Sequence, residues 1–455
     1  MSAPRPDGPA ATLAPLAGGA GINLLVAGPA HDLAAAGYVE DELSASGTAI
    51  SYRPVGRLGP DGDWTVEPDA SATYATRIVV RRPADAAAFN GTVVVEWFNV
   101  TAGTDTAADL AAVGEELLRR GYAYVGVSVQ ALGIEGGDPA IPVGPLGAAV
   151  GLRASDPARY GGLHHPGDSF SYDILTQIGR ALRTADGAAA ALGTLEPDRI
   201  LAIGESQSAF RLTTYLNGVE PLTRVYDGYL VHSRGRSAAA LTDGGEVAQA
   251  LTGPPIRIRT DGSAPVLIVE AEGDLIGRLD YLPARQDDTD TVRLWEMAGT
   301  AHADLHTAGD IGAFLGCAEP INSGPAHYIL NAALRQLDAW VTTGEVPPAA
   351  PRIEVDAAGA IVRDVHGNAL GGIRTPPVDV PVATLSGEPQ AGPVICSLFG
   401  STKAFDLATL TAVHGTREAY LATFEASLDA TIAAGFLLAD DRAAMLAEAG
   451  AVSFA

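Results

Sequence analysis

The feature that most constrains the fold of this chain is a regular alternation of apolar runs with helical patterns. Residues 91–100 form a continuous apolar run, typical of a strand buried on both faces. Residues 105–121 then have the pattern of a helix. Further strands are predicted at residues 122–130, 199–203, 225–233, 265–274 and 291–299. Since parallel strands need crossover connections, this alternation predicts an α/β fold with a mostly parallel central sheet flanked by helices.

Four segments are expected along the chain. Residues 1–30 are interrupted by Pro and Gly and predict a flexible leader, and residues 31–345 predict the α/β core. Within that core, residues from about 131 to 166 are rich in Gly and Pro. This stretch is too long for an ordinary connection and predicts a lid-like insertion. Residues 346–455 predict a C-terminal extension that packs on the core and ends in helices.

Composition narrows the possible partners and the compartment. The 455 residues carry a formal net charge of −25, which disfavours nucleic acid and anionic membranes as partners. No apolar run reaches transmembrane length. The first 25 residues contain one basic residue and make a poor signal peptide, so we expect a cytoplasmic protein. Whether the two cysteines, Cys317 and Cys396, form a disulfide stays open at this point.

Ser206 is the candidate nucleophile. It lies in the sequence Gly-Glu-Ser-Gln-Ser at positions 204–208, between an apolar strand and a predicted helix. A nucleophile elbow requires this context, because the serine must project from a tight turn at the edge of the sheet. Similar sequence matches around Ser169 and Ser237 do not lie directly between a strand and a helix. The alternative interpretation is that Ser206 only caps the following helix, and Ser208 stands where the usual pattern has glycine.

The candidate base is His302, and the candidate acid is Asp274 with Glu272 as the alternative. A serine hydroxyl needs a neighbouring base, which a carboxylate holds in the right tautomer. In α/β-hydrolases the order along the chain is serine, acid, histidine. Of nine histidines, His302 lies in the loop after the last predicted core strand, and both carboxylates follow the strand before it. The other histidines, His232 among them, are expected in surface or core packing.

Two backbone N–H groups are expected to bind the oxyanion that forms during acyl transfer. Gln207 should supply one, because it follows the nucleophile. The loop at residues 97–103, which begins at the end of the apolar run at 91–100, should supply the other, from Asn99 or Val100. The sequence contains no phosphate-binding loop and no metal-ligand spacing beyond an adjacent pair of histidines. We therefore expect neither a metal nor an organic cofactor.

Several segments together resemble a family of bacterial serine hydrolases known as the "α/β-hydrolase domain" proteins. The segments are FNGTVVVEWFNVTAG, RYGGLHHPGDSFSYDI, IGESQSAFRL, EMAGTAHADL, GGIRTPPVDVP and SLFGSTKAFD. The resemblance implies an α/β-hydrolase fold with carboxylic-ester hydrolase activity, and it implies that Ser208 belongs to the family pattern. Ser206 and His302 match the family's serine and histidine, whereas both Glu272 and Asp274 fall in its acidic segment.

The segment LHHPGDSFSYD offers two candidate substrate contacts, His165 and Tyr172. It follows the lid-like insertion and could shape the acyl or alcohol pocket. A structural role is the alternative, because Asp168 or Ser169 could cap the helix that follows.

The combined interpretation is a serine hydrolase that cleaves a small-molecule carboxylic ester through an acyl-enzyme. An acyltransferase or lactonase with the same residues is the nearest alternative, because water and alcohol compete for the same acyl-enzyme. A non-catalytic, ligand-binding hydrolase fold is the second alternative. A homo-oligomer formed through residues 350–455 is compatible with the first interpretation.

Overall fold

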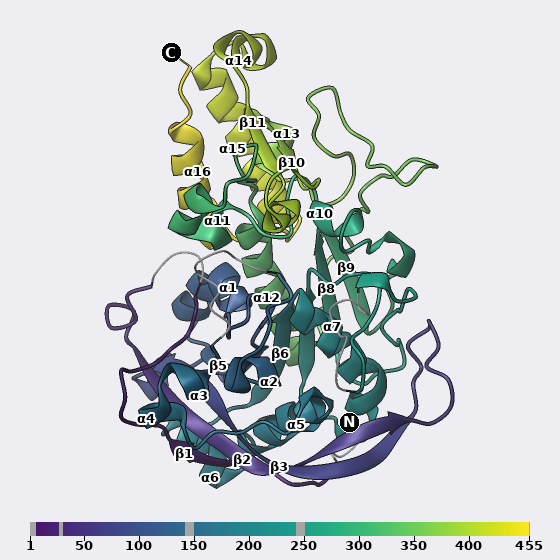
Figure 1. Cartoon of the computed structure of the whole chain (residues 1–455). Coiled ribbons are helices and arrows are strands. Elements are labelled where there is room, and N and C mark those ends of the chain that lie inside the picture. Colours follow the sequence, from purple (N-terminus) through teal and green to yellow (C-terminus); the bar gives the residue numbers. More distant parts are fainter. Residues whose placement is uncertain (1–5, 27–30, 142–149, 243–250, 455) are drawn as a thin grey trace.

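A nine-stranded sheet runs through the described part of the chain, in the strand order β1-β2-β3-β5-β4-β6-β7-β8-β9 (Figure 1). The computed structural model describes residues 6–26, 31–141, 150–242 and 251–454. The strands are β1 (Thr12–Pro15), β2 (Tyr38–Pro54), β3 (Val66–Pro83), β4 (Thr92–Trp97), β5 (Ala123–Val127), β6 (Arg199–Glu205), β7 (Gly228–His232), β8 (Val266–Ala271) and β9 (Val292–Met297).

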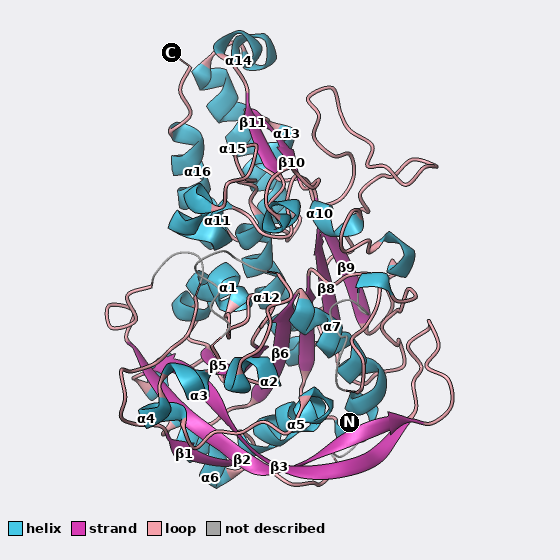
Figure 2. Ribbon diagram, viewed as in Figure 1, coloured by secondary structure: helices cyan, strands magenta, loops and turns pink. Residues whose placement is uncertain are grey.

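The sheet has a parallel part and an antiparallel part. Strands β5, β4, β6, β7, β8 and β9 pair in parallel, as the strand–helix alternation predicts. Strands β1, β2 and β3 pair antiparallel, and β3 joins them antiparallel to β5. In Figure 2 the long hairpin β2–β3 lies along the lower edge of the molecule. Strand β1 falls within the expected flexible leader, so the residues of that strand are held in the sheet.

Helices cover both faces of the parallel part. On β4, Val93 and Val95 pack in one cluster with α5 and α7, whereas Val94 packs in another with α1 and α12. Successive side chains of a strand point to opposite faces of the sheet. Because helices cover both faces of β4, every residue of this strand is buried. The helices of the core are α1 (Ala108–Arg119), α5 (Ser171–Ala181), α6 (Ala185–Leu192), α7 (Gln207–Thr214) and α12 (Ala326–Thr343).

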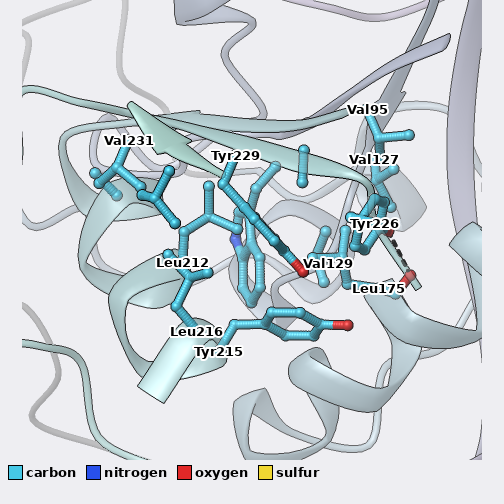
Figure 3. Packing of buried hydrophobic residues seen from close by; sticks show 14 of the residues in the cluster. Val95, Val127, Val129, Leu175, Leu212, Tyr215, Leu216, Tyr226, Tyr229 and Val231 are labelled. Atoms are coloured by element: carbon cyan, nitrogen blue, oxygen red, sulfur yellow. Dashed lines mark hydrogen bonds between the residues drawn. The ribbon is translucent and has the colours of Figure 1, made fainter. Parts of the chain in front are cut away.

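Three tyrosines fill the space under β6 and β7 on the α7 side. Tyr215, Tyr226 and Tyr229 lie with ring centroids 5.9 to 6.2 Å apart, at tilted or edge-to-face angles (Figure 3). Tyr226 donates a hydrogen bond of 2.7 Å to the backbone oxygen of Leu175. Aromatic packing of this kind supplies a large buried area with a fixed geometry. It anchors the helix that follows Ser206.

The insertion predicted at about 131–166 contains three short helices: α2 (Ala131–Glu135), α3 (Leu152–Ser155) and α4 (Pro157–Tyr160). Four of its side chains form a small apolar cluster of their own: Ile134, Leu152, Tyr160 and Leu163. The middle of the insertion, residues 142–149, lies outside the described residues. A lid function for this segment stays a prediction.

The C-terminal extension packs against α1 and α12. Tyr420, Phe424 and Leu428 belong to the same apolar cluster as these two helices, and Arg335 of α12 forms a 2.6 Å ion pair with Asp440 of the extension. The extension stands at the top of Figure 1. Its elements are α13 (Pro376–Asp379), β10 (Ala383–Ser386), β11 (Ser401–Ala404), α14 (Leu407–His414), α15 (Arg417–Ala433) and α16 (Arg442–Gly450), with β10 and β11 forming a second sheet.

A disulfide ties the extension to the core. Cys317 and Cys396 are bonded, with their Cα atoms 5.4 Å apart. Beside the bond, Leu398 and Phe399 pack against Ala308 in a small apolar cluster. The question that the sequence left open is thereby answered in this structure. The bond links Cys317, which follows the predicted base His302 in the sequence, to Cys396 of the C-terminal extension.

Short helices complete the described chain. They are α8 (Glu220–Thr223), α10 (Glu272–Leu275) and α11 (Leu305–Ala308). None of the helices in the described ranges combines the length and the apolar character that crossing a bilayer requires.

Candidate active site

Ser206 lies at the turn between β6 and α7 with a φ of 57° and a ψ of −117°. A positive φ is unfavourable for a residue with a side chain, and a nucleophile elbow holds its serine in this strained form. The side chain makes no capping hydrogen bond to α7, which argues against a purely capping role. A Cβ added at Gly204 would lie 3.0 Å from the Cβ of Ser208. The turn therefore favours glycine at 204 and accommodates a serine at 208.

His302 and Asp274 continue a line of hydrogen bonds that starts at Ser206. His302 Nε2 lies 2.9 Å from Ser206 Oγ, and His302 Nδ1 lies 2.7 Å from Asp274 Oδ1. The second oxygen of Asp274 accepts a 2.7 Å hydrogen bond from the backbone N–H of Ala271, which fixes the carboxylate at the start of α10. When Nδ1–H donates to Asp274, the lone pair of Nε2 is free to accept the serine proton.

Glu272 is occupied elsewhere. Its carboxylate accepts hydrogen bonds from the backbone N–H groups of Gly299 at 2.8 Å and Gly387 at 3.1 Å. It also pairs with Arg363 at 2.9 Å. Gly387 and Arg363 belong to the C-terminal extension, so Glu272 joins that extension to the loop that carries His302. The contacts favour Asp274 over Glu272 as the partner of His302.

The two candidate oxyanion donors from the loop after β4 differ in their partners. The Asn99 backbone N–H donates to the backbone oxygen of Thr106 at 3.0 Å and is thus occupied. The Val100 N–H donates to the side-chain oxygen Oε1 of Gln207 at 3.1 Å. The backbone N–H of Gln207 itself lies in the first turn of α7, where a helix offers no acceptor of its own. These contacts favour Val100 over Asn99 as a candidate donor, and Gln207 stays the other candidate.

A further carboxylate, that of Glu205, lies beside the same histidine. Glu205 Oε1 is 3.2 Å from His302 Nε2. Burial raises the pKa of Glu205 to about 7, although the nearby His302 and His232 oppose this shift. Burial lowers the pKa of His302, but the charges of Asp274 and Glu205 outweigh burial and raise it above its ordinary value. Two carboxylates therefore act on one imidazole.

His232, which the sequence pattern assigned to packing, forms a second buried histidine–aspartate pair. Its Nδ1 lies 2.9 Å from Oδ1 of Asp109, at the start of α1. Burial lowers the pKa of His232, but the hydrogen bond and charge of Asp109 outweigh burial and raise it. His232 pairs in register with Glu205 in the sheet, and its backbone oxygen accepts a hydrogen bond from the N–H of Ser206. Its position at the end of β7 was the available signal in the sequence.

A profile of the family described as "Alpha/beta hydrolase domain" matches residues 7–447. The chain belongs to this family. The match covers nearly the whole chain, confirms the predicted α/β-hydrolase fold and supports a hydrolase activity. No curated protein is significantly similar to the chain in sequence.

Solved structures with a similar arrangement are distant. Esterase 2 from Thermogutta terrifontis, in its apo form, is 15% identical with a TM-score of 0.34, over 60% of this chain and 91% of that one. An alpha-beta serine hydrolase homologue from Coxiella burnetii is 12% identical with a TM-score of 0.31, over 52% and 86%. A fungal esterase from Rhizomucor miehei is 10% identical with a TM-score of 0.32, over 66% and 85%. The assignment of this hydrolase rests on the family profile and not on these likenesses.

The two predicted substrate contacts of this hydrolase have other partners. His165 Nε2 lies 2.8 Å from the backbone oxygen of Val129, and its Nδ1 accepts a hydrogen bond from the Gly167 N–H. Tyr172 lies fully buried in the core, and its hydroxyl donates to the backbone oxygen of Ala240 at 2.6 Å. These contacts account for both side chains as structural residues. They give no support to the prediction that either residue touches a substrate.

The groups around Ser206 in this hydrolase are organic acids and bases. Within residues 6–26, 31–141, 150–242 and 251–454, no group of three or more His, Cys, Asp or Glu side chains is arranged to hold a metal ion. The chemistry available at Ser206 is that of a hydroxyl, an imidazole and carboxylates. This set of groups can transfer a proton and form a covalent bond to an acyl carbon.

Proposed function

We propose that this protein is a serine esterase that hydrolyses carboxylic esters through an acyl-enzyme, with Ser206, His302 and Asp274 as its catalytic triad. The observation that supports it most is the unbroken line from Ser206 Oγ to His302 at 2.9 Å and from His302 to Asp274 at 2.7 Å. The strained turn at Ser206 is a second, independent support. A helix cap or a packing histidine would need neither.

Acylation proceeds by attack of Ser206 Oγ on the ester carbonyl carbon. As the Oγ–carbon bond forms, the serine proton passes to His302 Nε2, and the carbonyl oxygen becomes an oxyanion. The backbone N–H groups of Val100 and Gln207 donate to that oxygen. His302 then returns the proton to the alcohol oxygen as the ester bond breaks, which leaves an acyl group on Ser206.

Deacylation repeats the same steps with water. His302 removes a proton from the water molecule, the hydroxide oxygen bonds to the acyl carbon, and the proton returns to Ser206 Oγ when the acid leaves. Asp274 holds the imidazole in one tautomer and stabilises the imidazolium in both halves of the reaction. Its side chain is fully buried, so water does not screen this interaction.

The test is hydrolysis of p-nitrophenyl esters of several acyl lengths by the wild type and four variants. We expect Ser206→Ala and His302→Ala to lose activity by several orders of magnitude, because each removes a reacting group. Asp274→Asn should lose far more activity than Glu272→Gln, since of these two carboxylates Asp274 is the one that contacts His302. Wild type, but not Ser206→Ala, should be labelled covalently by a phosphonate ester. Activity or labelling that survives in Ser206→Ala would overturn the proposal.

A further inference from the structure

The Glu205 carboxylate is held firmly beside the proton-carrying atom of His302. Its Oε1 lies 3.2 Å from His302 Nε2, the same nitrogen that faces Ser206. The other oxygen, Oε2, accepts a hydrogen bond of 3.1 Å from the side-chain amide of Asn99. The same amide group donates to the Glu205 backbone oxygen at 3.3 Å. Asn99 therefore fixes the orientation of this carboxylate.

Charged groups reach Glu205 from several elements. His302 lies on the loop after β9 and His232 at the end of β7, and both favour the ionised carboxylate. Asp109 of α1 and Asp274 of α10 disfavour it. Around His302 itself, Asp274 and Glu205 favour the imidazolium, and Arg278 opposes it. Glu205 thus stands between two imidazoles, each of which has its own aspartate on Nδ1.

We propose that Glu205 is a second carboxylate partner of His302, which shares with Asp274 the positive charge that His302 gains from the serine proton. This assignment rests on the proposed function. Asp274 accepts from Nδ1–H, whereas Glu205 contacts Nε2, where the proton arrives. After the Ser206 Oγ–H bond breaks, the new Nε2–H can donate to Glu205 Oε1 until the alcohol oxygen of the ester takes the proton. No electrons are transferred, and the proton remains on Nε2 throughout this contact.

Ionisation of Glu205 decides which way this contact acts. A neutral carboxyl can donate its own proton to Nε2 and compete with the Ser206 hydroxyl for the lone pair. An ionised carboxylate cannot donate, and it makes the imidazole a stronger base. Since the pKa of Glu205 is about 7, both forms exist near neutral pH. The ionised form is the one that assists the attack of Ser206.

The test compares pH profiles of kcat/KM for wild type and Glu205→Gln with p-nitrophenyl acetate. The substitution keeps the shape and an acceptor for Asn99 but removes the charge. We expect the acid limb of the profile to move to lower pH by about one unit, because His302 then loses its proton more easily. The plateau should fall about tenfold, because the imidazolium is less stabilised. An acid limb that stays in place or moves to higher pH overturns the proposal.

Glu270→Gln is the matched control. Glu270 is a fully buried glutamate at the same end of the sheet, near Asp274. It is not among the groups that chiefly shift the pKa of His302, so its profile should coincide with that of the wild type. If Glu205→Gln fails to fold, Asn99→Ala is the second variant. It releases the Glu205 carboxylate and should move the acid limb in the same direction by a smaller amount.

A second readout does not need an ester substrate. The imidazole of His302 is titrated by nitrogen-15 NMR in Ser206→Ala and in the double variant that adds Glu205→Gln. The double variant should titrate at lower pH. Activity that survives in Ser206→Ala would overturn the proposed function, whereas an unshifted titration of His302 would overturn only the role of Glu205.

Discussion

Two histidine–aspartate pairs lie at the same end of the sheet, and among the described residues the hydrogen bond to a serine hydroxyl is found at His302. In both pairs the histidine Nδ1 is hydrogen-bonded to a buried aspartate, at 2.7 Å for His302 and Asp274 and at 2.9 Å for His232 and Asp109. His302 lies in a loop that contacts the C-terminal extension, and its Nε2 faces Ser206 Oγ. His232 ends strand β7, where its backbone belongs to the sheet.

An imidazole–carboxylate pair is therefore not by itself a catalytic unit. The aspartate sets the tautomer and raises the proton affinity in both pairs. What differs is that the Nε2 of His302 contacts Ser206 and that His302 lies in a loop, whereas His232 lies in a strand.

Replacing the two histidines should give the largest difference. We expect His302→Ala to lower kcat/KM on the order of 10⁴-fold or more, because it removes the base. His232→Asn should lower it less than about tenfold, since Asn keeps a donor near Asp109 and His232 contacts Ser206 through its backbone oxygen, which the substitution keeps. The measurement is ester hydrolysis at one pH, with circular dichroism to establish that both variants fold. Equal losses in the two variants would contradict the assigned roles.

Replacing Asp274 and Asp109 tests the same difference between the two pairs through the partners of the histidines. Asp274→Asn should lower kcat by roughly 10⁴-fold, as expected when the base loses its correct tautomer. Asp109→Asn should lower kcat much less and should mainly destabilise the fold, because Asp109 is fully buried at the start of α1. Steady-state kinetics and urea unfolding separate the two effects. A larger kinetic loss in Asp109→Asn would mean that the wrong pair has been assigned to catalysis.

Removing the disulfide should affect the His302 side and spare the His232 side. The backbone N–H of Ala303 donates to the oxygen of Leu398, close to the bond at Cys396. A variant with both cysteines replaced by serine should lose about 2–4 kcal/mol of stability, because its unfolded chain is less restricted. Hydrogen exchange should increase in residues 298–322 and remain unchanged in residues 226–234. An increase confined to the second segment would contradict this.

Stability should depend on pH through His232. The pKa of His232 in the folded state lies above its ordinary value of about 6.5. Its contribution to stability is therefore complete below about pH 6.5 and is lost as the pH rises through the folded pKa. The stability difference between wild type and His232→Asn should be larger at about pH 6 than at about pH 9. Thermal melts at the two pH values measure it, and the reverse order would refute it.

Gln207→Ala should give the smallest effect. In the structure the Gln207 side-chain oxygen accepts from the Val100 N–H, where an ester oxygen would bind. Without the side chain, the ester oxygen no longer competes with the Gln207 side chain for the Val100 N–H. We therefore expect KM to fall a few-fold, by about 1 kcal/mol at most, with kcat unchanged. The backbone N–H of residue 207 is retained, so the oxyanion donors remain. A tenfold loss of kcat would instead mean that the side chain holds the Val100 loop in place.

The sequence predicted the elements that depend on local order and missed those that depend on distant contacts. The strand–turn–helix pattern around Ser206 and the loop position of His302 identified residues that the structure brings within 2.9 Å. Asp274 and Glu272 could not be separated, because they follow the same strand only two residues apart. Their environments differ through Arg363 and Gly387, which lie 91 and 115 residues away from Glu272.

The pairing of His232 with Asp109 joins residues 123 positions apart. It exists because β7 lies two strands away from β4, whose following helix α1 begins at the same edge of the sheet. Nothing in either local sequence marks that proximity. The contact between Glu205 and His302 was missed for the same reason. Glu205 is visible in the Gly-Glu-Ser-Gln-Ser motif, but its contact with His302 depends on the complete sheet.

The bond between Cys317 and Cys396 connects this architecture to the redox chemistry of its surroundings. Glutathione and thioredoxin keep most thiols reduced in the cytosol, and disulfides persist in oxidising compartments. In a reducing medium, apolar packing, the contacts of Glu272 and the hydrogen bond from Ala303 to Leu398 would hold the extension on the loop of His302. The oxidised and the reduced protein would thus differ in one covalent tie near the loop of His302. Samples prepared with and without a reductant should be handled as distinct species.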